Sequence, residues 1–322
     1  MNLYDAQRSN KAKTSVILVL FVLFFVLMGF GFDYFYLGGQ QAESGAFLPV
    51  ATMAALIFSL LFTTVGYFAG DKMVLASTQA RRIEEPANAE EKQLVNVVDE
   101  ITIAAGIPRP KLYIVPDPDP NAFATGRDPA HASIAVTQGL LNTLNREELQ
   151  GVIAHELSHV RNYDTLCMTL VAALVGAIGL LGNWALRTSF NRGERSRSSS
   201  SREGGGGVAI VFVVWIIAAI LAPILARILA MAVSRQREYL ADASGAELTR
   251  NPEALAHALA KVEQAVAPTK SIKQGMAHLC IADPQGLSLG SKEGFWADLF
   301  ATHPPMAKRI ARLQSMAYKQ TP

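Results

Sequence analysis

Four long stretches without Asp, Glu, Lys or Arg constrain the fold of this chain more than any other feature. A transmembrane helix needs about 20 apolar residues, and each stretch is long enough to supply them. Only 17% of the whole chain is charged and 50% is hydrophobic, whereas soluble domains have about 25% charged residues. We therefore expect an integral membrane protein with four transmembrane helices. The stretches are residues 14–32, 44–70, 165–186 and 208–226.

The stretches divide the chain into an N-terminal membrane anchor, a membrane hairpin and two polar blocks. The anchor is residues 1–70, with helices expected at about 14–36 and 46–70. A hairpin at residues 165–233 returns the chain to the side it left, so the polar blocks on either side of it can share one core. Together the blocks approach the size of a typical domain. They are residues 71–164 and 234–322.

The Lys and Arg residues around the first two stretches predict the topology. Arg8, Lys11 and Lys13 precede the first stretch, and positive residues favour the cytoplasmic side. The polar blocks are then cytoplasmic. The Ser/Arg/Gly-rich loop 187–207 is rich in Arg, although a spanning hairpin would place it outside. The sequence therefore leaves open whether residues 165–186 and 208–232 cross the membrane completely.

Periodicity and capping signals predict a mostly helical domain with a small β-sheet. Asn145 and Glu148 form a capping box that starts one of the helices. Short runs rich in β-branched residues, bounded by Gly and Pro, predict the strands. The expected helices are residues 89–105, 145–160, 230–248, 252–266 and 305–318, and the expected strands are 111–115, 121–126 and 132–137.

The helix that begins at Asn145 contains an H-E-x-x-H motif. His155 and His159 are four residues apart and share one helix face. Neutral imidazoles suit zinc, and Glu156 can act as general base on a zinc-bound water. A catalytic zinc site needs a third protein ligand. The motif therefore predicts a zinc hydrolase.

Glu238 is the best candidate for the third ligand. It lies shortly after the expected hairpin, while the two histidines lie shortly before it, so the hairpin would bring the helices together near the membrane surface. Asp242 follows one helical turn later and can accept a hydrogen bond from the outer nitrogen of a ligand histidine.

These motifs together resemble the HtpX family of membrane-embedded zinc endopeptidases, relatives of the CaaX prenyl protease. The resemblance covers essentially the whole chain. It implies that His155, His159 and Glu238 bind one zinc ion per chain, and that Glu156 is the catalytic acid/base. It also implies a zincin-type metalloprotease domain. The residues that carry it are 121–126 (NAFATG), 132–164, 234–243 (SRQREYLADA) and 302–313 (THPPMAKRIARL).

The resemblance also assigns further residues around the site. His303 and Arg309 match positions near the zinc, and His303 is our candidate for stabilising the oxyanion, with Tyr239 as a second candidate. His278 receives no role. The NAFATG segment resembles an edge strand that aligns the substrate backbone by strand addition. The substrate-binding residues expected from it are Asn121, Ala122, Phe123 and Ala124.

The resemblance thus implies an endopeptidase that cleaves misfolded or membrane proteins at the cytoplasmic face of the bacterial inner membrane. The family resemblance implies a role in stress response and protein quality control. Its partners are protein or peptide substrates and the lipid bilayer; the net charge of +2 gives no reason to expect nucleic acid. Substrate preference and oligomeric state are left open. The alternatives are a non-catalytic scaffold or holdase, disfavoured by the intact motif, and a transporter, disfavoured by the uncharged stretches.

Overall fold

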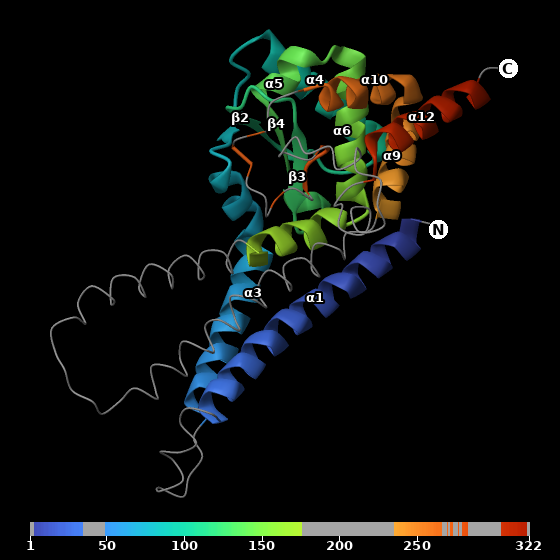
Figure 1. Ribbon diagram of the computed structural model, residues 1–322. Coiled ribbons are helices and arrows are strands. Elements are labelled where there is room, and N and C mark those ends of the chain that lie inside the picture. The colour runs from blue at the N-terminus through green and yellow to red at the C-terminus, as the bar shows by residue number, and fades with distance from the viewer. Residues whose placement is uncertain are drawn as a thin grey trace, which may run out of the picture.

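A helical domain around a small sheet, with two long helices extending from it, makes up the computed structural model (Figure 1). The mostly helical fold with a small sheet confirms the sequence prediction. The expected fourth apolar helix, loop 187–207, His278 and His303 lie outside the described residues. The structure describes residues 3–34, 49–175, 235–265, 269, 271–272, 276, 279–282 and 304–320.

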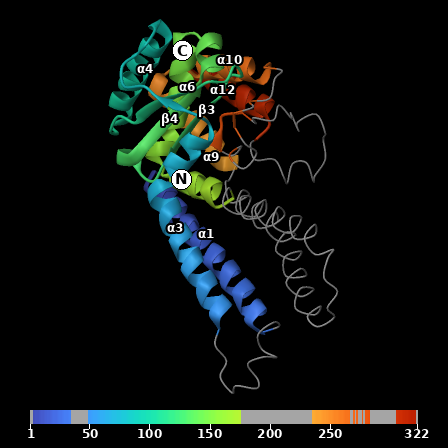
Figure 2. The ribbon, with the colours of Figure 1, turned by 90° about the vertical axis from the view of Figure 1, so that its left-hand side faces the viewer.

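The two long helices, α1 (Leu3–Phe32) and α3 (Val50–Ser77), lie side by side and leave the domain together (Figures 1 and 2). Both are long and apolar enough to cross a membrane. Among the described residues, every exposed large hydrophobic side chain except Ile103 belongs to the segment from Val16 to Phe68. The pair of helices α1 and α3 therefore exposes an apolar surface, whose contact with water is unfavourable.

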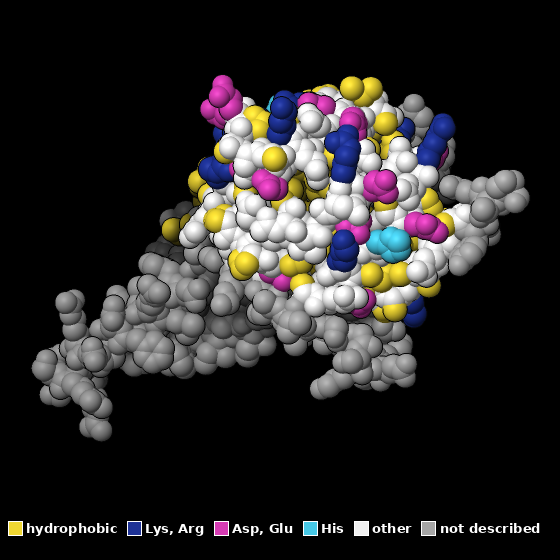
Figure 3. Space-filling model, turned by 90° about the horizontal axis from the view of Figure 1, so that it is seen from above, with side chains coloured by type: hydrophobic (Ala, Val, Ile, Leu, Met, Phe, Trp, Pro, Cys, Tyr) yellow, Lys and Arg dark blue, Asp and Glu magenta, His cyan; other side chains and the backbone are white. Residues whose placement is uncertain are grey.

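The opposite end of the molecule has a different surface. Seen from the side opposite α1 and α3, the domain shows Lys, Arg, Asp and Glu side chains interspersed with small hydrophobic areas (Figure 3). Mixed charges of this kind are typical of a face turned toward water.

Two contacts join α1 and α3 at the end that lies away from the domain. The Asp33 carboxylate accepts hydrogen bonds from the Ala51 amide at 2.9 Å and from the Thr52 amide and hydroxyl, both at 2.7 Å. Asp33 thus caps the first turn of α3 from outside that helix. A Cβ atom on Gly29 would lie 2.6 Å from the Ala51 carbonyl oxygen, so the close approach of the helices requires glycine there.

The sheet contains four described strands in the order β1-β2-β4-β3. β2 and β4 are parallel, and the other two pairs are antiparallel. β3 lies at one edge, beside helix α6. The strands are β1 (Arg81–Arg82), β2 (Lys111–Val115), β3 (Ala122–Gly126) and β4 (Ala132–Thr137).

The outward edge of β3 is bounded at both ends. The Ile281 amide donates to the Ala122 carbonyl at 3.0 Å, and Phe123 forms an antiparallel bridge with Cys280. At the other end, the Gly126 amide donates to the Thr169 hydroxyl at 3.0 Å. The part of this edge between the two contacts is centred on Ala124.

Helix α6 (Arg146–Arg161) is the central element of the domain. It packs against α4, α9, α10 and β3. The capping box of Asn145 and Glu148 forms at its start, as the sequence predicted. Because α6 is surrounded, His155, Glu156 and His159 are all buried, and buried polar groups need partners. The other described helices are α4 (Ala89–Ala105), α5 (Gln138–Thr143), the helix Asp164–Val175, α9 (Arg235–Thr249), α10 (Pro252–Glu263), α12 (Met306–Gln320) and the 3-10 helix η2 (Pro129–His131).

Candidate metal centre

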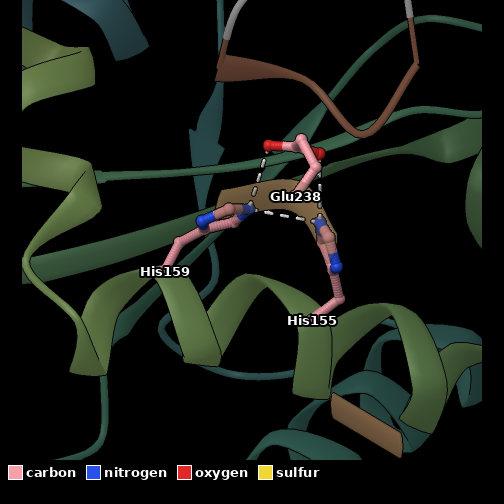
Figure 4. A group of neighbouring side chains, drawn as sticks. All are labelled: His155, His159 and Glu238. Atoms are coloured by element: carbon pink, nitrogen blue, oxygen red, sulfur yellow. Dashed lines mark hydrogen bonds and ion pairs between the residues drawn. The ribbon is translucent and has the colours of Figure 1, made fainter. Parts of the chain in front are cut away.

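The side chains of His155 and His159 project from α6 toward Glu238, which comes from α9 (Figure 4). One ligand atom from each residue lies within 4.8 Å of the others. Each Nε2 atom lies near a different Glu238 oxygen, at 3.7 Å for His155 and 3.5 Å for His159, and the two Nε2 atoms are 3.2 Å apart. All three side chains are buried, so the group is enclosed and converges on one point.

The outer ring nitrogens of both histidines have carboxylate partners. His155 Nδ1 lies 3.0 Å from Asp242 Oδ1, and His159 Nδ1 lies 3.0 Å from Asp164 Oδ2. These contacts leave both Nε2 atoms facing Glu238. A catalytic zinc site uses a donor set of this kind, here two imidazole nitrogens and one carboxylate. In such sites a carboxylate often accepts a hydrogen bond from the outer nitrogen of each ligand histidine. The residues present therefore fit zinc.

Arg309 from α12 completes this arrangement. It donates two hydrogen bonds to Asp242, from Nε at 2.9 Å and from Nη2 at 2.7 Å, and a third to the Ile281 carbonyl at 3.1 Å. Its Nη1 lies 3.5 Å from Glu238 Oε2. Burial opposes ionisation of Asp242, but the charge of Arg309 and the close contact with His155 outweigh it and lower the pKa of Asp242 to about 2. Asp242 therefore stays charged next to the outer ring nitrogen of His155.

Glu156 follows His155 on α6, which packs against β3, and its side chain is buried. Its pKa is raised to about 7, mainly because the side chain is buried. The Ala124 backbone on β3 opposes this rise to a small extent. A carboxyl group with this pKa can both accept and release a proton near neutral pH. It does so beside an edge to which a peptide could add.

A glycine allows α9 to approach α6 at the centre. A Cβ atom on Gly245 would lie 3.0 Å from the His155 backbone nitrogen and 3.2 Å from its Cα. The absence of a side chain at this position sets the distance between the two helices that supply the ligands.

The other expected site residues lie in different settings. The Asn121 side chain is buried and donates to the Thr269 hydroxyl and the Ala282 carbonyl, both at 3.2 Å. Asn121 thus supports the segment beside β3. The Tyr239 ring packs under the Arg312 guanidinium at 4.2 Å, which is a contact between α9 and α12.

Asp164 is the site residue that sequence reasoning did not assign. The H-E-x-x-H motif and the family resemblance give it no role, yet it is the partner of His159. The available signal was a carboxylate five residues after the second histidine of the motif. Five residues do not place two side chains on the same helix face. The contact forms because α6 ends and Tyr163 adopts a left-handed conformation, with φ of 60°.

Comparisons with known proteins identify the family. The sequence model of Peptidase family M48 matches residues 88–317. The chain is 42% identical over 316 residues to the "Protease HtpX homolog" of Thermoanaerobacter pseudethanolicus, covering 98% of both chains. It is 43% identical over 315 residues to that of Dictyoglomus turgidum, covering 97% of this chain and 94% of the relative. The solved structure of S. mikatae Ste24p aligns with a TM-score of 0.47 and 17% identity, covering 97% of this chain and 66% of that one.

The family model spans most of the chain, and the relatives align with nearly all of it. The sequence resemblance to HtpX proteases is confirmed. The chain belongs to peptidase family M48 and is a zinc-dependent metalloprotease of the HtpX type.

Proposed function

We propose that this protease is a membrane-bound endopeptidase that hydrolyses misfolded or membrane proteins at the cytoplasmic face of the bacterial inner membrane. The apolar surface of α1 and α3 supports insertion into a bilayer. The uncharged part of α1, residues 14–32, would span about 28 Å, close to the hydrocarbon thickness of a membrane. Arg8, Lys11 and Lys13 at the domain end of α1 support a cytoplasmic domain.

The observation that carries the proposed chemistry is the buried group of His155, His159 and Glu238, with Glu156 on the same helix as the two histidines. That helix packs against β3, so a buried base and the metal group lie beside the edge of the sheet. We propose that the substrate backbone adds to the part of this edge around Ala124. Ala122 and Phe123 are already paired with Ile281 and Cys280, so they limit the length of edge that a substrate can use.

Each residue of the site has its own role in the proposed reaction. A zinc ion held by His155, His159 and Glu238 would polarise the scissile carbonyl and acidify the attacking water. Glu156 accepts the proton of that water and then delivers it to the leaving amine. Arg309 holds Asp242 in place, and Asp242 in turn orients His155.

The decisive experiment replaces the proposed base. Glu156→Gln in the purified, detergent-solubilised chain should lower cleavage of an unfolded model protein by about 10²–10⁴-fold, because proton transfer is lost. Zinc content should be unchanged, since Glu156 is not a proposed ligand. Glu147→Gln, at an exposed position on the same helix, is the matched control. Equal cleavage by the wild type and Glu156→Gln would overturn the assignment of the base.

A labelling experiment tests whether the protease domain lies on the cytoplasmic side of the membrane. Both native cysteines are buried, so a cysteine introduced at the exposed position Glu253 on α10 supplies the reactive thiol, with the unmodified chain as background. A membrane-impermeant maleimide should label it in inverted inner-membrane vesicles and not in intact spheroplasts. Labelling in spheroplasts would contradict a cytoplasmic domain.

A further inference from the structure

The domain end of α1 contacts the turn that follows the H-E-x-x-H helix. We propose that α1 is part of the metal centre as well as an anchor, and that Asn10 is a positioning residue which holds Asp164 against His159. The proposal rests on the metal ligands of the proposed function. It concerns how one of those ligands is oriented, which can be measured without any proteolysis.

Asn10 lies within hydrogen-bond distance of two groups of this turn. Its Nδ2 donates to Asp164 Oδ1 at 2.5 Å and to the Asn162 carbonyl at 3.0 Å. A primary amide carries two N–H groups, so it can make both bonds at once. The side chain is only 3% exposed, which means that water does not compete for either bond. Asn10 therefore fixes one oxygen of Asp164 and the backbone that leads to it.

The other oxygen of Asp164 contacts the metal ligand. Asp164 Oδ2 lies 3.0 Å from His159 Nδ1. Arg237 of α9 approaches the same oxygen as Asn10, at 3.3 Å. One buried carboxylate thus joins α1, α6 and α9. A carboxylate bound to the outer nitrogen of a ligand histidine sets the tautomer and the direction of the ring, so its own position affects the metal.

Two further side chains of α1 bind the same turn. Gln7 Nε2 donates to the Arg161 carbonyl at 2.9 Å, and Lys11 Nζ lies 4.2 Å from the centre of the Tyr163 ring. Positions 7, 10 and 11 share one face of a helix. The turn is also the place where the chain adopts the left-handed conformation at Tyr163. These contacts hold α1 against the turn, and of the three side chains Asn10 is the one that bonds to Asp164 itself.

Apolar contacts continue this interface away from the domain. Ile17 and Phe21 of α1 pack against residues of the helix Asp164–Val175, which directly follows the turn. Helix α1 thus contacts the helix Asp164–Val175 along its length, in addition to its first residue, Asp164. A shift of α1 along the interface would move the amide of Asn10 relative to the carboxylate.

The test measures zinc affinity in the full-length chain in detergent, by competition with a zinc-binding dye, in the Glu156→Gln background. Replacing a group that directly orients a ligand costs about 10–100-fold in metal affinity. Asn10 acts one step further out, so Asn10→Leu should weaken zinc binding about three- to tenfold. Gln7→Leu breaks a bond to the same turn without touching Asp164, and it should change the affinity less than about twofold.

A double-mutant cycle separates positioning from general support. Asp164→Asn alone should weaken zinc binding about 10–100-fold. In that background Asn10→Leu should add less than about twofold, because coupled residues are not additive. An equal effect of Asn10→Leu in both backgrounds would overturn the proposal. So would an effect no larger than that of Gln7→Leu.

Two further measurements guard against misfolding. The thermal unfolding midpoint of each metal-free variant shows whether it is folded, and Asn10→Ser replaces Asn10→Leu where the latter is not. The visible spectrum of the cobalt-loaded chain should change for Asn10→Leu and stay unchanged for Gln7→Leu, since it reports the geometry at the metal. If the wild-type chain binds zinc but does not cleave protein, the proposed function fails and this inference stands.

Discussion

At the scale of single residues, Glu91 shows how the domain accommodates a buried charge away from the metal. It lies in the first turn of α4 and is 2% exposed. Burial opposes its ionisation, but hydrogen bonds from the Ala87 amide at 3.0 Å and from Arg81 outweigh it, so its pKa is lower than the ordinary value of 4.5. A carboxyl group with a lowered pKa stabilises the fold while it is charged, and this contribution disappears as pH falls.

The prediction concerns Glu91→Gln. At pH 7 the variant should unfold with about 1–2 kcal/mol less free energy than the wild type, because hydrogen bonds to a charged acceptor are lost. The difference should shrink as the pH falls below 4.5, where the carboxyl group of the unfolded chain becomes protonated, and disappear below the lowered pKa of the folded chain. Urea unfolding in detergent, followed by circular dichroism at a series of pH values, measures it. A difference that stays constant down to pH 3.5 would show that the charge of Glu91 does not stabilise the fold.

At the scale of elements, the contact between α6 and α9 determines whether the ligands meet. Gly245→Ala would place a methyl group 3.0 Å from the His155 backbone nitrogen, so α9 must move away. We expect a loss of about 1–3 kcal/mol in unfolding free energy and weaker zinc binding, because Glu238 moves with α9. Glu247→Ala changes an exposed residue of the same helix and should alter neither property.

Thermal unfolding and dye competition for zinc measure both effects of Gly245→Ala. If the variant loses stability but keeps the zinc affinity of the wild type, the spacing of the two helices does not control the site.

Elements with strong local signals could be predicted from the sequence. Helix α4 has the predicted bounds because Asn88 caps its start and Gly106 ends it with a φ of 65°. By contrast, α5 (Gln138–Thr143) was not predicted. It is short, and it is held by the Thr137 cap and by burial of Leu140, which depends on neighbouring elements. β1 (Arg81–Arg82) is likewise a strand only because β2 pairs with it.

The same distinction applies to the site. His155 and His159 belong to one local motif, and Glu238 with Asp242 belongs to another, so all four could be selected from the sequence. Asn10 could not, because its partner Asp164 is 154 residues away and no spacing rule connects them. The local chemistry of the site was predictable, whereas the contacts from α1 required the tertiary structure.

At the scale of the whole molecule, zinc should stabilise the fold because its ligands come from two separate parts of the chain. With zinc at 1,000 times its dissociation constant, binding should add about 4 kcal/mol to the unfolding free energy and raise the unfolding midpoint by several degrees. Chelation should reverse the gain. Differential scanning fluorimetry of the full chain in detergent measures it.

The control for this prediction is Glu238→Gln, which keeps the shape of a ligand and removes its charge. It should greatly reduce the zinc-dependent part of the midpoint. Glu247→Gln, on the exposed side of the same helix, should retain it. A midpoint that does not respond to zinc in the wild type would mean that the metal does not link the two parts.

The contact of Arg309 with Asp242 has a consequence for biosynthesis. The ribosome makes α1 and α3 first and α12 after every other helix described here. Until α12 emerges and packs, Asp242 lacks the guanidinium that holds it behind His155. We therefore expect the metal centre of a nascent chain to stay incomplete until Arg309 has been synthesised. We expect this delay to keep the enzyme from cutting its own unfolded segments during translation.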